Sequence, residues 1–239
     1  MEIDSKFVVP GTKIDISFLS NQNNSENPNE NTPVILGPGL LDFESGVISY
    51  AAGELQHNSK DTIWVDFNKK RYVPAELEPV IGTVVARHAE GYRVDIGSAH
   101  IANLNSLAFE NATKRNKPNL NPGTLVYGRV CLANKFLEPE IECYNSNTNK
   151  ADGYGELADG FLIKTSLKHC RRLLKQNPAI LTSLGEHLSF EIAIGLNGFV
   201  WIKSQTHDRT ILIANAIKNS EFLSDADCKL MVTQLISSL

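Results

Sequence analysis

Short apolar stretches separated by glycine and proline make up the first part of the chain. The turn residues are Pro10-Gly11 and Gly37-Pro38-Gly39, and the apolar stretches cover residues 7–9, 34–36, 46–48 and 62–67. This pattern predicts short strands joined by turns, and so a small all-β unit that ends near Tyr72-Val73-Pro74. Residues 20–31 are nearly all polar and rich in asparagine, which predicts a disordered loop within this unit.

From Pro79 onward, apolar and polar residues alternate in short segments at regular spacing. The strands that we expect here cover residues 80–87, 92–96, 100–104, 125–131 and 140–144. Five short strands in about seventy residues are typical of a five-stranded Greek-key barrel, the OB-type architecture. Between the third and fourth strands, residues 111–118 carry Lys114, Arg115 and Lys117 and no acidic residue.

The last third of the chain changes to the periodicity of helices. Glycines at positions 153, 155 and 160 indicate a hinge-like connection. Apolar residues then fall on one helical face, at Ile163, Leu167, Cys170 and Leu174. Asn177-Pro178 should end this helix because proline cannot continue it, and Gly185 should end the next helix in a left-handed cap.

Two alternating stretches, 190–194 and 199–203, flank Gly195-Leu196-Asn197-Gly198. An Asn-Gly pair between alternating stretches predicts a β-hairpin, with positive φ angles at the glycines and at Asn197. Two closing helices are expected over residues 210–218 and 224–236, the second with a capping box formed by Ser224 and Asp227. The order strand, helix, helix, strand, strand, helix, with an extra helix, predicts an α+β domain.

We therefore expect a mainly β protein with an α+β C-terminal part, built from three modules. They are an N-terminal β domain over residues 1–76, a barrel over 77–148 and an α+β domain over 149–239.

Composition limits the function classes that these modules can serve. The formal net charge of the 239 residues is −4 and the pI is about 5.9, which argues against strong RNA affinity for the isolated chain but allows a local basic patch. The sequence contains no run of eighteen apolar residues, so it predicts no membrane span, and its first residues do not resemble a signal peptide. The spacing of the four cysteines fits no zinc finger, so we expect reduced cysteines in a cytosolic or nuclear protein.

Four segments of the predicted barrel resemble S1 RNA-binding domains, which have the OB fold. They are residues 81–85, 91–97, 100–104, whose His-Ile-Ala-Asn-Leu is similar to the family's HISEL strand, and 122–126. Over almost the whole chain, the arrangement of an N-terminal β unit, an S1 barrel and a KH-like domain resembles the cap subunits of the eukaryotic RNA exosome. Residues 108–118, 138–143 and 195–201 carry this wider resemblance and favour one of the three cap types. Glu78-Pro79 departs from it, since the family usually has Gly-Asp there.

The resemblance implies a non-catalytic role without a cofactor or a metal. Such subunits sit on a ring of RNase-PH-like proteins beside other cap subunits. They guide single-stranded RNA to a separate exonuclease subunit during rRNA maturation and mRNA turnover. It further implies a location in the nucleus and nucleolus, and also in the cytoplasm.

Three barrel residues are candidates for RNA contact, namely Tyr92, Arg93 and His100, because aromatic and cationic groups on an OB-type face suit bases and phosphates. The alternative is that Tyr92 packs under a loop and that His100 is an ordinary surface histidine. S1 domains commonly place an aromatic residue where this chain has Arg93, so one stacking platform is expected to be missing. Lys114, Arg115 and Lys117 form a second candidate group. Solvation, RNA contact and docking to an acidic protein neighbour all fit this loop.

Two further groups have a structural or docking interpretation. Gly195-Leu196-Asn197-Gly198 lies between strands and not between the first two helices, so we expect a structural turn near the S1 domain and not the RNA clamp of a working KH domain. The first helix of the KH-like domain bears a basic face with no acidic residue. Its cations are Lys164, Lys168, Arg171, Arg172 and Lys175, and either solvation or contact with a ring subunit explains them.

Two other function classes stay open at this stage. A stand-alone S1/KH RNA-binding factor is the nearer alternative. A metal-dependent hydrolase is the more distant one, because Glu138, Glu140 and Glu142 alternate on one strand but no second acidic or histidine cluster accompanies them.

Overall fold

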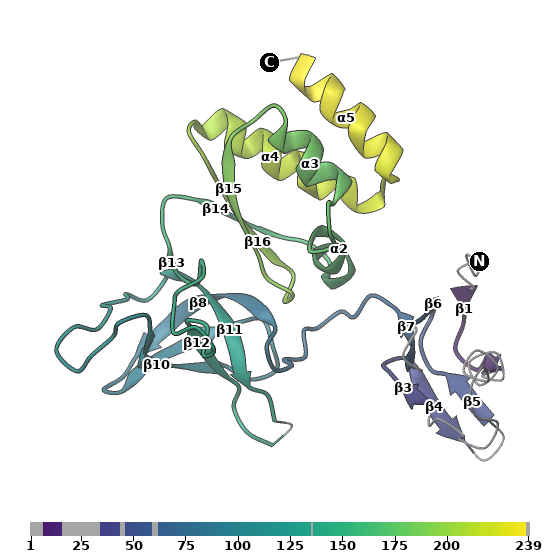
Figure 1. The fold of residues 1–239 in the computed structure, drawn as a ribbon, viewed down its shortest axis with the longest axis horizontal. Coiled ribbons are helices and arrows are strands. Elements are labelled where there is room, and N and C mark those ends of the chain that lie inside the picture. Colours follow the sequence, from purple (N-terminus) through teal and green to yellow (C-terminus); the bar gives the residue numbers. More distant parts are fainter. Residues whose placement is uncertain (1–6, 16–33, 44–45, 59–61, 135, 238–239) are drawn as a thin grey trace. The chain divides into compact units, whose positions relative to one another are not determined.

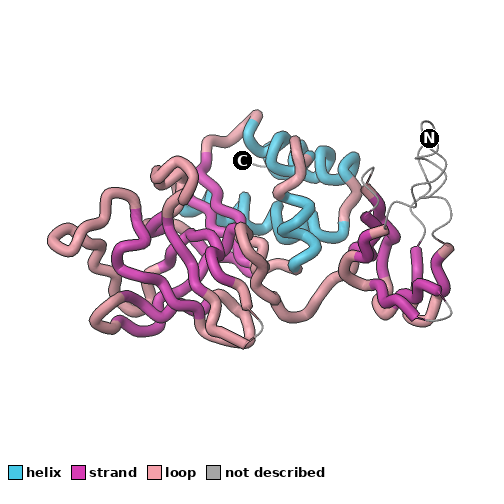
Figure 2. Tube along the Cα trace, turned by 60° about the horizontal axis from the view of Figure 1, so that its bottom comes forward, coloured by secondary structure: helices cyan, strands magenta, loops and turns pink. Residues whose placement is uncertain are grey.

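The computed structural model describes residues 7–15, 34–43, 46–58, 62–134 and 136–237 (Figure 1). The chain forms two compact units, Met1–Asn68 and Lys69–Leu239. The disorder predicted for residues 20–31 lies outside the described residues. Figure 2 shows that the described helices lie in the C-terminal part and that strands dominate the rest, so the predicted fold class is confirmed.

The first unit contains two small sheets around one apolar cluster. One sheet has the order β1-β6-β7-β3, in which β3 and β7 are parallel, and the other has the order β2-β5-β4. The strands are β1 (Phe7–Val8), β2 (Lys13–Ile14), β3 (Ile35–Leu36), β4 (Leu40–Phe43), β5 (Gly46–Ser49), β6 (Gly53–His57) and β7 (Thr62–Asp66). Val8, Ile63 and Val65 are buried between the sheets. The predicted glycine turn is needed at Gly39, whose φ is +92° and whose missing Cβ would lie 2.6 Å from the Cβ of Val65.

A closed barrel begins the second unit. Its strands are β8 (Pro79–Arg87), β9 (Gly91–Asp95), β10 (Ala102–Phe109), β11 (Leu125–Leu132) and β12 (Glu140–Cys143), followed by β13 (Gly155–Leu157). They pair in the order β12-β10-β9-β8-β11-β13, and β12 also pairs with β11, which closes the ring. Apolar side chains from different strands fill the interior, among them Val84 of β8, Val94 of β9 and Val126 of β11. The predicted five-stranded barrel is therefore confirmed.

Two sequence predictions at the barrel need correction. The third strand begins at Ala102, so His100 lies in the turn before β10 and not on the strand. The connection after the barrel is not a hinge at Gly155, because β13 pairs with β11 through Tyr127↔Gly155. This extra strand extends the barrel sheet toward the C-terminal region.

The C-terminal region is a three-stranded antiparallel sheet with helices packed on it. Its elements are β14 (Phe161–Lys164), α2 (Leu167–Leu173), α3 (Ala179–Gly185), β15 (Phe190–Ile194), β16 (Phe199–Ser204), α4 (His207–Asn219), η1 (Ser220–Phe222) and α5 (Asp225–Ser237). The sheet order is β14-β16-β15. Cys170, Ile202, Ile213 and Ile217 are wholly buried in the core between sheet and helices. The predicted order of elements is confirmed, including the cap of α5, where the Ser224 hydroxyl accepts from the Asp227 amide at 3.3 Å.

The helical details differ from prediction at two places. Ile163 belongs to strand β14, so the helix begins four residues later, where the Ser166 hydroxyl accepts a hydrogen bond from the His169 amide at 3.2 Å. Gly185 is the last residue of α3 and has no positive φ. The chain continues in tight turns to Leu188, whose amide donates to the Leu184 carbonyl at 2.8 Å, so no left-handed cap is formed.

The hairpin between β15 and β16 joins the KH-like region to the barrel. Of its four predicted turn residues, only Gly198 has a positive φ, +87°, which corrects the expectation for Gly195 and Asn197. The buried Asn197 amide donates to the carbonyls of Ile81 (2.7 Å) and Ile96 (2.9 Å), and its oxygen accepts from the Ile81 amide (3.2 Å). A Cβ at Gly195 would lie 2.8 Å from the Ile81 nitrogen. The tetrapeptide therefore lies directly against strand β8.

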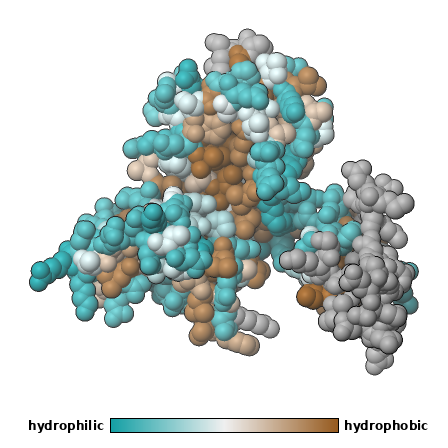
Figure 3. Space-filling view, in the orientation of Figure 1, coloured by the Kyte–Doolittle hydropathy of each residue, from teal (hydrophilic) through white to brown (hydrophobic). Residues whose placement is uncertain are grey.

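Apolar side chains surround this contact. Ile81 of the barrel packs with Ala193 and Trp201 of the C-terminal sheet, and Figure 3 shows apolar residues gathered where the helical region meets the barrel. Tyr127 lies at the rim of the cluster and donates to the Ile194 carbonyl at 3.4 Å. Burial raises the pKa of Tyr127 to about 12, so its hydroxyl stays protonated at neutral pH. The barrel and the KH-like region thus share a buried interface.

Candidate nucleic-acid interface

The loop between β10 and β11, residues 110–124, carries the three predicted cations, and we call it the cationic loop. Lys114, Arg115 and Lys117 are all exposed. A turn forms the tip, where the Thr113 amide donates to the Asn116 carbonyl at 2.8 Å and the Asn116 amide donates to the Thr113 hydroxyl at 3.1 Å. Among the described residues, none of the three cations has an acidic partner within salt-bridge distance.

The base of the cationic loop is fixed to the barrel. Leu120 is 1% exposed and is part of the barrel core. The Tyr92 hydroxyl donates to the Pro118 carbonyl and accepts from the Leu120 amide at 3.3 Å. Arg87 at the end of β8 donates to the Asn119 side chain. The three cations are therefore carried by a loop with a defined base.

Tyr92 packs under the cationic loop, which was the alternative to RNA contact. Its side chain is 2% exposed and lies in the barrel core with Val94, two residues along β9. A ring buried to this extent offers no face on which a base could stack. This corrects the expectation that Tyr92 is a stacking platform, and its hydroxyl serves instead to hold the cationic loop.

Arg93 points to the opposite side of β9 and is part of a surface cluster. Its Nη2 lies 2.8 Å from Oε1 of Glu138, and the two side chains are 43% and 47% exposed. The other oxygen of Glu138 accepts from Asn103 Nδ2 at 2.9 Å. Asn103 lies directly opposite Arg93 on β10, so two neighbouring strands hold one carboxylate from the loop before β12.

His100 is exposed in the turn between β9 and β10. The structure fixes the backbone of this turn through hydrogen bonds from the Gly97 amide to Asp95 at 2.8 Å and from the Ser98 hydroxyl to the His100 carbonyl. Among the described residues, no hydrogen bond or ion pair joins the His100 side chain to Arg93 or to the cationic loop. Its assignment to the RNA surface stays a prediction.

A groove of about 520 Å³ runs along β10 and β12. Its polar lining includes His88, Glu90, Asn105, Glu140 and Glu142. Glu142 is paired with Arg129 across the sheet (Nε–Oε1 3.1 Å), in a nearly buried ion pair. Within the described part of the chain, no group of three or more His, Cys, Asp or Glu residues is placed to hold a metal ion.

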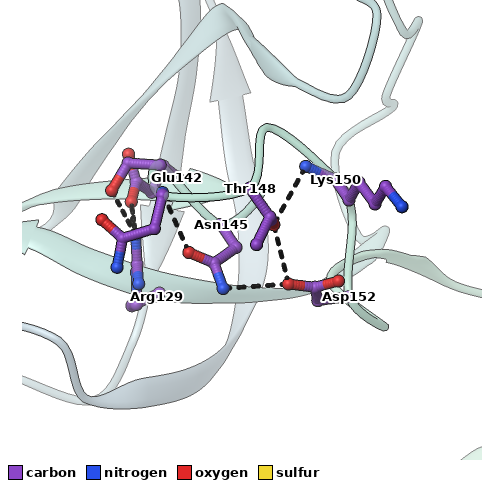
Figure 4. Close-up of polar contacts among 8 residues, drawn as sticks. Arg129, Glu142, Asn145, Thr148, Lys150 and Asp152 are labelled. Atoms are coloured by element: carbon purple, nitrogen blue, oxygen red, sulfur yellow. Dashed lines mark hydrogen bonds and ion pairs between the residues drawn. The ribbon is translucent and has the colours of Figure 1, made fainter.

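The ion pair of Arg129 and Glu142 lies beside the loop that follows β12 (Figure 4). Arg129 also donates to the Ser146 hydroxyl at 2.8 Å. Asp152 accepts from the Asn145 amide group at 2.9 Å and from the Thr148 hydroxyl at 3.1 Å. These polar contacts hold the connection between the barrel and β13 in one conformation.

The predicted basic face of α2 is only partly a surface feature. Arg172 donates to the carbonyl of Ser220, the C-cap of α4, and to that of Leu223, directly after η1. It therefore joins α2 to the segment that follows α4, which corrects its assignment to a docking face. Lys164 and Lys175 are exposed, whereas Lys168 and Arg171 are half-buried and have interactions within the chain.

Sequence reasoning missed Asn103 and the pairing of Glu138 with Arg93. The period-two pattern of β9, with Tyr92 and Val94 on one face and Arg93 on the other, was a readable signal for the burial of Tyr92. No comparable signal linked Glu138 to Arg93, because 45 residues separate them. None of the described helices is long and apolar enough to cross a membrane.

Three family models match consecutive parts of the chain. Residues 34–71 match the model described as the exosome complex exonuclease Rrp40 N-terminal domain, residues 72–155 the S1 domain of exosome complex component RRP40, and residues 160–208 a KH domain.

Curated relatives cover most of the chain. It is 45% identical over 238 residues to exosome complex component rrp40 of Schizosaccharomyces pombe, a match that covers 96% of this chain and 95% of the relative. It is 44% identical to RRP40 of Drosophila melanogaster (79% and 81% covered) and 36% identical to RRP40 of Homo sapiens (86% and 77% covered). A crystal structure assigned to an exosome complex RNA-binding protein shares the fold, with a TM-score of 0.58 at 19% identity over 71% of this chain and 99% of that one.

Proposed function

Because the chain belongs to the Rrp40 family of exosome complex components, we propose that it is a non-catalytic, RNA-binding cap subunit of the RNA exosome. It helps to thread single-stranded RNA toward a separate 3′–5′ exonuclease subunit, in rRNA maturation and mRNA turnover, and it stabilises the subunit ring. The S1 barrel supplies the surface for RNA, and the KH-like region supports the barrel from one side.

The observation that carries this function is the cationic loop. The chain has a net charge of −4, so its overall field repels RNA and phosphates must be met by a local patch. Lys114, Arg115 and Lys117 are such a patch, since they are exposed, close in sequence and without acidic partners among the described residues. They lie on a barrel of the type that binds single strands on an open face.

The partners follow from family membership. We expect contact with RNase-PH-like ring subunits and with the other cap subunits, and no membrane partner. Lys164 and Lys175 of the KH-like region are exposed cations that suit an acidic ring subunit. We further propose work in the nucleus and nucleolus and also in the cytoplasm, which fractionation of cells with a tagged chain would test.

The test of RNA contact replaces Lys114, Arg115 and Lys117 together by serine in the assembled complex. Each lost phosphate contact on a single strand should lower the log–log salt slope of binding by about 0.7, so the slope should fall by roughly 2. A matched control replaces Lys218 and Lys229, exposed lysines of α4 and α5, and should leave the slope unchanged. If the loop variant assembles normally with an unchanged slope and RNA footprint, the loop does not touch RNA. A defect in assembly would instead identify a protein contact.

Two measurements separate this function from the alternatives. In cell extract, a cap subunit should elute with a large assembly on size exclusion, whereas a stand-alone S1/KH factor should elute alone. The purified chain should leave labelled single-stranded RNA intact. Metal-dependent cleavage that follows the pure protein and is lost in Glu140→Gln would support a hydrolase and contradict the non-catalytic role.

A further inference from the structure

We propose that Arg93 and Asn103 form a phosphate-binding site on the barrel face and that Glu138 occupies this site in the RNA-free protein. The inference rests on the proposed function, because it assumes that an RNA backbone passes this face. It adds a specific position for one phosphate and a residue of the chain that competes with RNA for it.

The geometry is that of an anion held by donors from two strands. One oxygen of Glu138 is 2.8 Å from Arg93 Nη2, and the other is 2.9 Å from Asn103 Nδ2. The two donors face each other across the β9–β10 pairing. A phosphodiester also presents two non-bridging oxygens that share one negative charge, so it can accept from the same two donors.

The ion pair is of a kind that an incoming anion can replace. Both side chains are nearly half exposed, at 43% and 47%, and exposed pairs of this type contribute little to stability. The contact is also incomplete, because the buried Nε of Arg93 has no hydrogen-bond partner among the described residues. Moving the guanidinium outward would expose this unpaired donor to water or to phosphate.

Glu138 remains beside the site when it is displaced. It directly precedes Pro139, which is buried and whose carbonyl accepts from the Asn103 amide at 2.9 Å. The backbone of Glu138 is therefore tied to the strand that carries the phosphate donor. The carboxylate can return as soon as the phosphate leaves, which weakens the hold on a strand that has to move along the face.

The test measures the affinity of the complex assembled with the full-length chain for a short, fluorescently labelled oligouridylate, by anisotropy over a salt series. Glu138→Gln keeps the size of the side chain and an oxygen for Asn103 but removes the competing charge. It should tighten binding roughly three- to fivefold, the range that an exposed ion pair can withhold. The control is Glu140→Gln, which removes another exposed charge two residues away and should change affinity less. Thermal melts should show that both variants fold like the wild type.

A double variant separates occupation of the site from general repulsion. In an Arg93→Gln background, Glu138→Gln should gain no more than the Glu140 control does, because the site is already lost. Equal gains from Glu138→Gln and Glu140→Gln in the wild-type background would overturn the inference. The inference would also be overturned if Glu138→Gln left the affinity unchanged while Arg93→Gln and the triple serine variant weakened binding. That result would leave the proposed function standing. If no variant differs from the wild type, or if none binds, the face is not an RNA surface, and the inference and the function fail together.

Discussion

The hydrogen bonds of Asn197 are expected to be the strongest single polar link between the barrel and the KH-like region. On strand β8, pairing with β9 begins at Thr83↔Asp95, so the amide and carbonyl of Ile81 lie beyond the end of the neighbouring strand. Asn197 pairs with both of these groups and also with the Ile96 carbonyl, at 2.7–3.2 Å, and is itself 4% exposed. An asparagine side chain can serve two acceptors and one donor at once, which explains its presence at this position.

Asn197→Ala would leave three buried backbone groups without partners. Each hydrogen bond contributes about 1 kcal/mol net, and stranded buried groups add to that cost, so the free energy of unfolding should fall by roughly 3–5 kcal/mol. Asn197→Asp keeps the shape but turns an oxygen toward two carbonyl oxygens, and should cost at least as much at pH 7.

Urea unfolding of the full-length chain, followed by circular dichroism, measures this loss. The matched control is Asn215→Ala on the exposed side of α4, which should be neutral or slightly stabilising because alanine favours helix. A loss below about 1 kcal/mol in Asn197→Ala would mean that water reaches Ile81 and Ile96 and that the link is not buried in solution.

Three further predictions concern other parts of the second unit. Gly198→Val should cost roughly 1–3 kcal/mol because φ is +87° and a Cβ would lie 2.9 Å from the Thr165 carbonyl oxygen; an unchanged melting temperature would contradict this. Burial lowers the pKa of His169 below its ordinary 6.5, so the unfolded state binds the proton first and stability should decline as pH falls through 6.5, and His169→Gln should flatten that pH dependence of urea unfolding. Tyr92→Phe removes the hydroxyl that holds the cationic loop, so trypsin should cleave at the loop faster than in wild type, and equal cleavage rates would show that the loop base is held without it.

The order of elements in the KH-like region and the five barrel strands could be predicted because these elements have strong local patterns. Strand β10 begins with alternating apolar and polar residues, from Ala102 to Asn105, and the hairpin before Phe199 carries its own turn residues. The pattern was weaker in β6, where Leu55 is the only large apolar residue among the five, and this strand was not predicted. It forms because its neighbours β1 and β7 supply the pairing on both sides.

The candidate site was less predictable, because its geometry depends on contacts between distant segments. Arg172 looked like a surface cation by sequence, but carbonyls of the segment that follows α4, almost fifty residues later, take up its guanidinium. Arg93 was identified as a cation, but its partner Glu138 comes from another loop. A local pattern predicts on which side of a strand a charged residue lies. Whether that charge is paired with a distant residue depends on the tertiary fold.

This distinction decides how much charge the barrel offers to RNA. The cations proposed to contact RNA are Arg93 and the three of the cationic loop. Four of them are available if Arg93 is free, and three if Glu138 neutralises it. Phosphate contacts add to affinity and to its salt dependence one by one. The subunit carries net negative charge, and Glu138 neutralises one of its few cations, Arg93, until RNA arrives. Such a subunit is expected to bind a single strand weakly at any one position. Weak, replaceable contacts suit a strand that must slide past the barrel, since a phosphate held firmly at one position would have to be released before the next could take its place.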